Sequence, residues 1–167
     1  MITLRAWSPA DLDDLVHFAN NERIANNLTN MFPHPYTPEA GTAFIAMANS
    51  HEPQQIFAID LDGRAIGAIG IHPQGDIWSK NAEIGYWLAE PYWGKGIITQ
   101  TIREIVSYGF ATFDLERIFA RPFGRNLGSQ KALQKAGFQF EAQIKQNLFK
   151  NGTFEDELIY GIRRPLG

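Results

Sequence analysis

Residues 93–99 read Trp93-Gly94-Lys95-Gly96-Ile97-Ile98-Thr99 and separate two segments with different hydrophobic patterns. Before them, Asn81 to Ala89 has the composition of a strand. After them, apolar residues recur at helical spacing and predict one buried helix face: Ile98, Ile102, Ile105, Val106, Phe110 and Phe113. A strand, a glycine loop and a helix in this order favour the binding of a phosphate, because unpaired N–H groups and the positive helix end meet there.

The residues of the loop fit this interpretation. Gly94 and Gly96 allow a ligand to come close to the backbone, Lys95 adds a positive charge, and Thr99 offers a hydroxyl. A Walker loop, G-x-x-x-x-G-K-[ST], is excluded because the lysine precedes the second glycine. The dinucleotide fingerprint G-x-G-x-x-G is excluded because position 99 is threonine. Taken alone, the pattern leaves open a glycine turn that only leads into a helix.

Composition places the chain among ordinary globular proteins. Its 167 residues fit a single domain, 1–167, with 44% apolar and 20% charged residues. This is enough material for one sizeable core. The net charge is −3 and the lysines and arginines are scattered, so we expect no direct binding of nucleic acid.

Several site types are excluded by what the chain lacks. Without cysteine it has no disulfide, thiolate metal site or cysteine nucleophile. The four histidines have no metal-ligand spacing, so we expect no metal. The first residues do not read as a signal peptide, and no apolar run approaches the roughly 20 residues that span a bilayer. We therefore expect a cytoplasmic protein that does not bind membranes.

Toward the N-terminus the sequence predicts helices followed by a β-meander. Ser8-Pro9-Ala10-Asp11 is a helix start, with serine as N-cap and proline in the first turn. Asp62-Gly63 is a strong hairpin turn. The expected elements are a strand at 2–7, helices at 8–20, 22–28 and from Thr37, a loop at 29–37, and strands at 55–61, 65–72 and 81–89.

Toward the C-terminus we expect a strand at 117–123 and a helix at 127–136 closed by Gly137. A final hairpin, 138–149 and 154–162, turns at Asn151-Gly152. The long helix between the fourth and fifth strands is a crossover, so these two strands can lie parallel. The predicted fold class is α/β (α+β), with a mixed and mostly antiparallel sheet of about seven strands flanked by helices rather than a doubly wound sheet.

Two spaced motifs carry a resemblance to a known family. AEIGYWLAEPYWGKGIITQTI (82–102) resembles the central motif of the GNAT N-acetyltransferases, and NLGSQKALQKAGF (126–138) resembles their second motif. The opening residues, 4–28 and 33–45, are similar to those of the ribosomal-protein N-terminal acetyltransferases, the RimJ/RimL type. The resemblance covers nearly the whole chain. It implies a GNAT sheet splayed between the fourth and fifth strands, and acetyl-coenzyme A as donor.

The resemblance also implies which residues hold the donor. The loop and helix start would bind the pyrophosphate through the amides of Gly94, Lys95, Gly96, Ile97, Ile98 and Thr99, next to Trp93. The pantetheine arm would lie along Trp87, Leu88 and Ala89. Asn126 and Ser129 match the coenzyme contacts of the next strand–helix junction.

Three positions depart from the general family pattern. Many members have glutamine or arginine at the position of Trp93. Tryptophan at this position is usual in the RimJ/RimL type. Ile98 replaces a small residue. Leu133 stands where many members carry a tyrosine that protonates the leaving thiolate, so Ser129 becomes the candidate acid, directly or through water.

Candidate residues for the acceptor side come from the same likeness. Glu83, on the strand that enters the site, is the candidate general base; the alternative is a cross-strand pair with a basic neighbour. Asp156 and Glu157 are weaker candidates. Tyr36, Tyr86 and Glu83 are the expected acceptor contacts, and residues 147–153 the opposite wall.

Three functions remain open from the sequence. The first is acetyl transfer to the N-terminal amine of a protein or peptide, by direct attack in a ternary complex. The second is the same chemistry on a small amine such as a polyamine, an amino sugar or an amino acid. The third is a coenzyme A-binding module without catalysis. Family members are often dimers, so a homodimer is one expected state.

Overall fold

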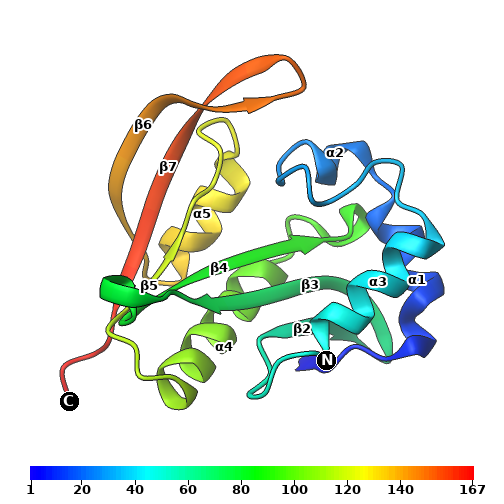
Figure 1. The fold of residues 1–167 in the computed structure, drawn as a ribbon, viewed down its shortest axis with the longest axis horizontal. Coiled ribbons are helices and arrows are strands. Elements are labelled where there is room, and N and C mark those ends of the chain that lie inside the picture. Colours follow the sequence, from blue (N-terminus) through cyan, green and yellow to red (C-terminus); the bar gives the residue numbers. More distant parts are fainter. The chain divides into compact units, whose positions relative to one another are not determined.

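A computed structural model describes residues 1–167 (Figure 1). Five α-helices follow the expected order: α1 (Leu12–Ala19), α2 (Glu22–Ala25), α3 (Pro38–Ala48), α4 (Ile97–Thr112) and α5 (Leu127–Lys135). Seven strands accompany them: β1 (Ile2–Arg5), β2 (Ile56–Leu61), β3 (Arg64–Pro73), β4 (Asn81–Leu88), β5 (Arg117–Ala120), β6 (Gln139–Lys150) and β7 (Thr153–Arg163). Short 3-10 helices occur at Pro9–Asp11, Asp76–Trp78 and Glu90–Tyr92.

Hydrogen bonds join the strands into one seven-stranded sheet in the order β1-β2-β3-β4-β5-β7-β6. β1 with β2, β2 with β3, β5 with β7 and β6 with β7 are antiparallel. β4 and β5 are parallel, because α4 forms the crossover between them. The predicted fold class, a mixed and mostly antiparallel sheet with helices, is therefore confirmed.

The parallel pair is short. Residues 81–83 of β4 face 117–119 of β5, ending at Glu83 opposite Phe119, whereas β4 itself continues to Leu88. β5 also ends earlier than the predicted strand at 117–123. Pro122 has no N–H to donate, and beyond it only an isolated bridge joins Phe123 to Glu157.

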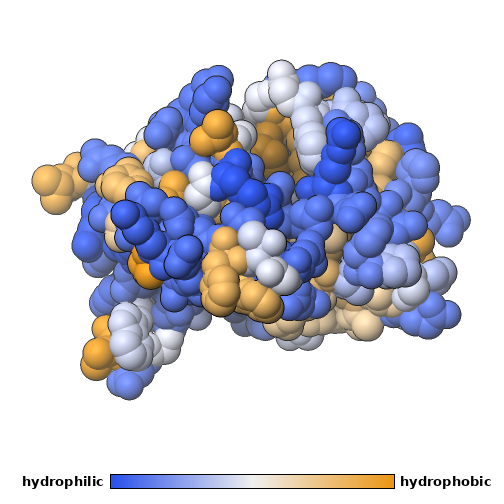
Figure 2. Space-filling model, turned by 90° about the horizontal axis from the view of Figure 1, so that it is seen from above, coloured by the Kyte–Doolittle hydropathy of each residue, from blue (hydrophilic) through white to orange (hydrophobic).

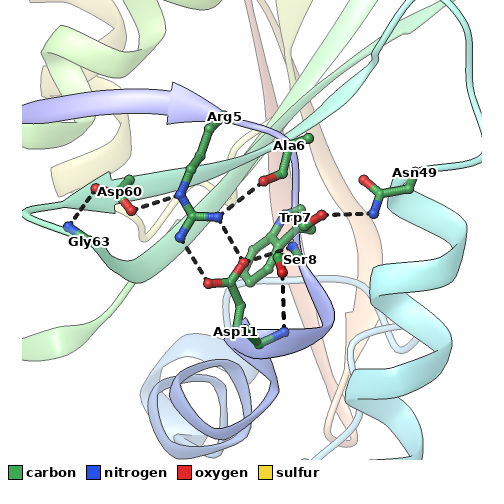
Figure 3. A network of polar contacts seen from close by, with 9 residues as sticks. Arg5, Ala6, Trp7, Ser8, Asp11, Asn49, Asp60 and Gly63 are labelled. Carbon is green, nitrogen blue, oxygen red and sulfur yellow. Dashed lines mark hydrogen bonds and ion pairs between the residues drawn. The ribbon is translucent and has the colours of Figure 1, made fainter.

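The chain forms two compact units, one of residues 1–70 and 86–97, the other of residues 71–85 and 98–167. In the first unit, Ser8 caps the turn before α1 in a capping box with Asp11. Asp11 in turn accepts hydrogen bonds of 2.8 Å from both terminal nitrogens of Arg5, whose Nε bonds to Asp60 (Figure 3). This network fixes β1 to β2 and to the start of α1.

Helices α1 and α3 of the first unit pack closely, and a glycine makes this possible. A β-carbon added at Gly41 in α3 would lie 2.8 Å from Leu12 and 3.2 Å from Val16 of α1. Trp7 is buried and meets the ring of Phe44 edge-on at 5.3 Å, so the segment that follows β1 also packs against α3. These contacts set the position of residues 29–37, which connect α2 to α3.

In the second unit, Ile102 and Ile105 of the predicted apolar face of α4 are fully buried, whereas Ile98, Val106 and Phe110 are half-buried and Phe113 lies beyond the helix. A β-carbon at Gly109 would meet Ile71 of β3 at 2.4 Å and Ile118 of β5 at 3.1 Å. Glycine therefore lets α4 lie close against these strands. This packing fixes the helix whose first turn follows the glycine loop.

The long β6–β7 hairpin, orange to red in Figure 1, closes the second unit. Asn151 and Gly152 at its turn have φ of 53° and 76°, as the predicted Asn-Gly turn requires. Hydrophilic residues cover most of the face seen in Figure 2, and hydrophobic ones occur there in separate groups. None of the helices combines the length and apolar character needed to cross a bilayer.

Candidate active site

The glycine loop has the backbone that the sequence predicts. Gly94 and Gly96 have φ of 75° and 77°, a left-handed conformation that favours glycine. No heavy atom lies within 4 Å of a β-carbon added at either position. Both glycines therefore leave open space beside the backbone at the start of α4.

Backbone donors of this loop and of the first turn of α4 remain available. Outside the regular elements, no amide from Gly94 to Ile98 donates to another backbone group. The first amides of a helix also have no partner within the helix. A row of consecutive N–H groups thus lies at the positive end of α4, which spans 16 residues.

Aromatic contacts hold the same loop. The Nε1 of Trp93 donates a 2.7 Å hydrogen bond to the carbonyl oxygen of Leu88, although the indole ring is half exposed. The ammonium group of Lys95 lies 5.6 Å from the centre of the Tyr92 ring, at cation–π distance. Lys95 is exposed, so its charge is accessible.

The end of β4 is buried and closely packed. Trp87, Leu88 and Ala89 are 7%, 5% and 0% exposed, and Tyr86 is half-buried. Ala89 donates a backbone hydrogen bond to Ile66 of β3. A β-carbon at Gly67 would lie 2.4 Å from the carbonyl oxygen of Trp87, so glycine permits this approach. The strand end before the loop is therefore rigidly placed.

Tyr36 reaches this strand end through a second aromatic ring. Its ring centre lies 5.1 Å from that of Phe32, which lies 5.8 Å from that of Trp87. Tyr36 is 5% exposed, and burial raises its pKa to about 12. It lines an apolar groove of about 300 Å³ between residues 31–36 and α3. Tyr36 and Trp87 are thus brought into one aromatic cluster.

Glu83 is paired, which was the alternative left open by the sequence. Its two carboxylate oxygens accept hydrogen bonds of 2.7 and 3.1 Å from Nε and Nη2 of Arg121. The Glu83 side chain is 25% exposed. Hydrogen bonding to Glu83 is the largest effect that raises the pKa of Arg121, so the guanidinium stays charged. Each carboxylate oxygen keeps a further lone pair.

Sequence reasoning missed Arg121. Only the structure gives the register that places it: Glu83 faces Phe119 in the parallel pair, and Arg121 stands two residues further along, on the same side. The Nη1 of Arg121 also lies 4.0 Å from Oε2 of Glu157, a carboxylate that is 6% exposed. Asn147, within the predicted wall, donates to Oε1 of Glu157 at 3.2 Å.

The second motif forms the start of α5. The Oδ1 of Asn126 accepts a 3.2 Å hydrogen bond from the amide of Ser129, so Asn126 is the N-cap of this helix. Ser129 is half-buried in the first turn. The structure therefore gives Asn126 a structural role that does not depend on a ligand.

Other acids near the candidate residues are paired as well. Glu90, before the loop, accepts hydrogen bonds from Asn21 at 2.9 Å and from Arg23 at 2.8 Å. The Asn21 bond is the largest effect that lowers the pKa of Glu90. Glu90 therefore anchors the start of α2. The structure contains no group of three His, Cys, Asp or Glu side chains that could hold a metal.

Residues 1–139 match the sequence model of the Acetyltransferase (GNAT) domain family. The chain belongs to this GNAT family. The uncharacterized N-acetyltransferase p20 of Bacillus licheniformis is 32% identical over 174 aligned positions, which cover 96% of this chain and 92% of p20.

Other acetyltransferases match over smaller shares of this chain. The uncharacterized N-acetyltransferase YoaA of Bacillus subtilis is 39% identical over 100 residues, which are 60% of this chain and 56% of YoaA. The match thus spans only about half of that relative. A ribosomal-protein-serine acetyltransferase of Escherichia coli is 30% identical over 64% of this chain and 59% of its own length. A spermidine N(1)-acetyltransferase of the same species is 22% identical over 90% of this chain and 81% of its own length.

Solved GNAT structures have the same fold. An acetyltransferase of the GNAT family from Bacillus anthracis superposes with a TM-score of 0.83 at 21% identity, covering 97% of this chain and 94% of that one. RimL, a ribosomal L7/L12 α-N-protein acetyltransferase in complex with coenzyme A, also gives 0.83 at 21% identity, covering 97% and 93%. At this identity the likeness shows the fold.

Proposed function

We propose that this GNAT protein is an N-acetyltransferase that moves an acetyl group from acetyl-coenzyme A to the N-terminal amine of a protein or peptide. The observation that carries the proposal is the loop before α4. Its glycines leave open space, and the amides from Gly94 to Ile98 donate to no other backbone group. The RimL structure named above contains coenzyme A, which agrees with this donor.

The residues fit a pyrophosphate. Phosphate oxygens accept hydrogen bonds, and the loop offers consecutive donors at the positive end of a helix. Ile98 and Thr99 are half-buried in the first turn, so the backbone and not the side chains would supply most contacts. Lys95 would add a long-range attraction, and Trp93 would hold the loop through its bond to Leu88.

The pantetheine arm would follow residues 87–89, whose backbone is fixed by β3. At its end the acceptor nitrogen attacks the thioester carbonyl, the new C–N bond forms, and the C–S bond breaks. The nitrogen loses one proton and the thiolate gains one. Ser129 is the proposed proton donor to the thiolate, directly or through water, and donors near the carbonyl would stabilise its developing charge.

An N-terminal amine needs little help to become neutral. With a pKa of about 8, its neutral form costs about 1 kcal/mol at pH 7, whereas a lysine side chain costs about 4–5 kcal/mol. Glu83 is the proposed base, acting on the amine or on a water. The remaining lone pairs of its carboxylate stay available while Arg121 occupies one edge.

The hydrogen bonds and ion pairs that the acids of the last hairpin already form favour a peptide amine over a polyamine. A polyamine site needs several unpaired carboxylates, but the acids of the last hairpin are occupied. Glu155 lies 3.1 Å from Arg125, and Asp156 accepts from Gln143 at 2.8 Å. Tyr36 and Tyr86 would supply neutral walls. The spermidine N(1)-acetyltransferase among the relatives keeps a small amine as the second candidate.

The test is a transfer assay. Labelled acetyl-coenzyme A would be incubated with peptides that begin with different residues, with the same peptides blocked at the N-terminus, and with spermidine, amino sugars and amino acids. We expect label only in peptides with a free N-terminus. Label in spermidine alone would identify a polyamine instead of a peptide as the acceptor. Binding of the coenzyme without any transfer would support a non-catalytic module.

Two further proposals concern the domain organisation and the oligomeric state of the protein. We propose that residues 1–167 fold as one domain and that the protein forms a homodimer. A single unfolding transition and a sedimentation mass of twice 18.8 kDa would agree with both. Two separate transitions or a monomeric mass would contradict them.

A further inference from the structure

Four polar side chains from separate segments gather within the second unit. Glu83 lies on β4, Arg121 directly follows β5, Asn147 lies on β6 and Glu157 on β7. Arg121 forms two hydrogen bonds to Glu83 and approaches Glu157 to 4.0 Å, and Asn147 donates to the other oxygen of Glu157. The chain of contacts therefore runs from β6 to the proposed base.

A β-bulge places the far end of this chain. The β6–β7 register shifts between the pairs Ile144 with Glu157 and Leu148 with Glu155, so β6 has extra residues at 145–147. Gln146 has φ of 51°, and its amide donates to Oδ1 of Asp156 at 2.9 Å. Bulges of this kind re-aim side chains. Here the bulge holds Asn147 against Glu157.

The charges of the group are unequal. Two carboxylates share one guanidinium, which leaves one net negative charge. Glu157 is 6% exposed, and a buried carboxylate is costly unless a partner offsets its charge. Arg121 is the cation within reach of both acids, with 47% of its own side chain exposed. Two hydrogen bonds thus join its guanidinium to Glu83, and the carboxylate of Glu157 attracts it from 4.0 Å.

We propose that Arg121 is a positioning residue that fixes the carboxylate of Glu83 toward the acceptor amine. This inference rests on the proposed function, in which Glu83 is the base. A planar guanidinium bound to both oxygens defines the plane of the carboxylate. The free lone pair on each oxygen of Glu83 then has a fixed direction, and proton transfer depends strongly on such geometry. The alternative is an ion pair that only stabilises the β4–β5 pair.

The experiment is a double-mutant cycle on acetyl transfer with Glu83→Gln, Arg121→Gln and the double variant. We expect Arg121→Gln to lower kcat about 10-fold or more, while the KM for acetyl-coenzyme A stays within about twofold. Because Arg121 acts through Glu83, the double variant should be no slower than Glu83→Gln. Arg121→Lys should recover part of the rate, since it keeps the positive charge.

Arg117→Gln is the matched control. Arg117 is the first residue of β5, the strand that Arg121 follows, and its Nε donates to Glu141 at 3.2 Å, but it contacts neither Glu83 nor Glu157. We expect this variant to retain the wild-type kcat, and thermal unfolding would show whether each variant is folded. Loss of kcat in Arg117→Gln equal to that in Arg121→Gln would assign both to structure.

Further outcomes separate this inference from the function on which it rests. If the losses of kcat in the two single variants multiplied in the double variant, Arg121 would act independently of Glu83. This result would overturn the inference but leave the proposed transferase function intact. A Glu83→Gln variant with wild-type kcat would overturn both the base and its positioning residue. Absence of transfer by the unmodified protein to any amine would overturn the proposed function itself.

Discussion

The indole Nε1 of Trp93 donates a 2.7 Å hydrogen bond to the carbonyl oxygen of Leu88, the last residue of β4. This bond closes the turn between the end of β4 and the first glycine of the loop. The residue that departs from the general family pattern thus has a physical role here. It holds the strand end and the loop, which are both proposed to contact the donor, in one fixed arrangement.

Replacing Trp93 by phenylalanine keeps an aromatic ring and removes the donor. Leu88 is 5% exposed, so its carbonyl would lose a partner at a cost of about 1 kcal/mol. We expect the dissociation constant for acetyl-coenzyme A, measured by calorimetry, to rise about 5-fold. Trp78→Phe, which changes a tryptophan outside the motif, is the control. If the Trp93 variant and the unmodified protein bound acetyl-coenzyme A with equal affinity, the hydrogen bond of Trp93 would have no role in donor binding.

Gly96→Asp tests the phosphate site directly. The substitution adds a side chain to the open space beside the loop and a negative charge near the proposed pyrophosphate. Two like charges 4 Å apart repel by about 4 kcal/mol at an effective dielectric constant of 20. We expect calorimetry to show a loss of affinity for acetyl-coenzyme A of more than about 100-fold.

Gly152→Asp is the matched control for Gly96→Asp. Gly152 has φ of 76°, almost equal to that of Gly96, and it also has no atom within 4 Å of an added β-carbon. Both variants carry the cost of a left-handed aspartate, about 1–2 kcal/mol. Only the Gly96 variant should lose the coenzyme. If the two variants bound it equally well, the loop would not be the phosphate site.

Local signals made most of the elements predictable. Asp62-Gly63 and Asn151-Gly152 are turns because both positions need positive φ, and α4 follows from its apolar spacing. The position of β7 between β5 and β6 did not follow from these signals. Strand order depends on packing between distant segments. The alternation of side chains along a strand, with its period of two residues, does not encode this packing. The sequence therefore predicted the elements and the sheet class, but not every neighbour.

The candidate site, too, was only partly predictable from the sequence. The backbone of Gly94 and Gly96 depends on local conformation, and the structure has it as expected. The partner of Glu83 depends on the register of the parallel pair and lies 38 positions away. The role of Asn147 depends on a bulge, which has no reliable sequence signal. Side-chain pairs that join distant strands thus required the structure.

Ser129→Ala separates catalysis from donor binding. The amide of Ser129, not its side chain, bonds to Asn126, so the variant keeps the cap of α5. If the hydroxyl protonates the thiolate, kcat should fall about 100-fold, while affinity for acetyl-coenzyme A should change about twofold at most. Steady-state kinetics and calorimetry measure the two quantities. A loss of affinity with unchanged kcat would make Ser129 a binding residue only.

Asn126→Ala should act differently from Ser129→Ala, through stability. The side chain is the N-cap of α5, and loss of such a cap costs about 1 kcal/mol. We expect a lower midpoint in urea denaturation. If Asn126 also contacts the donor, saturating acetyl-coenzyme A should stabilise this variant less than the unmodified protein. Equal stabilisation of both would restrict Asn126 to its capping role.

Acid sensitivity should arise in part from Asp11, in the network of Figure 3. Burial alone would raise the pKa of Asp11, but hydrogen bonds from Arg5 and from the Ser8 amide, with the charge of Arg5, hold it below its ordinary value of 3.8. A lower pKa in the folded state stabilises the protein above the unfolded value. This stabilisation is lost as the pH falls through the folded value.

Asp11→Asn removes this dependence, because the amide carries no charge at any pH. We expect the free energy of unfolding at pH 7 to fall by about 2 kcal/mol, since a charged hydrogen-bond partner is lost. The difference from the unmodified protein should then shrink as the pH falls below 3.8 toward the lowered pKa of Asp11 in the folded state. Urea denaturation across this range measures it, with Asp13→Asn, an exposed acid of α1, as control. A difference that stays constant down to the lowest pH would mean that the network stabilises the fold through packing rather than through the charge of Asp11.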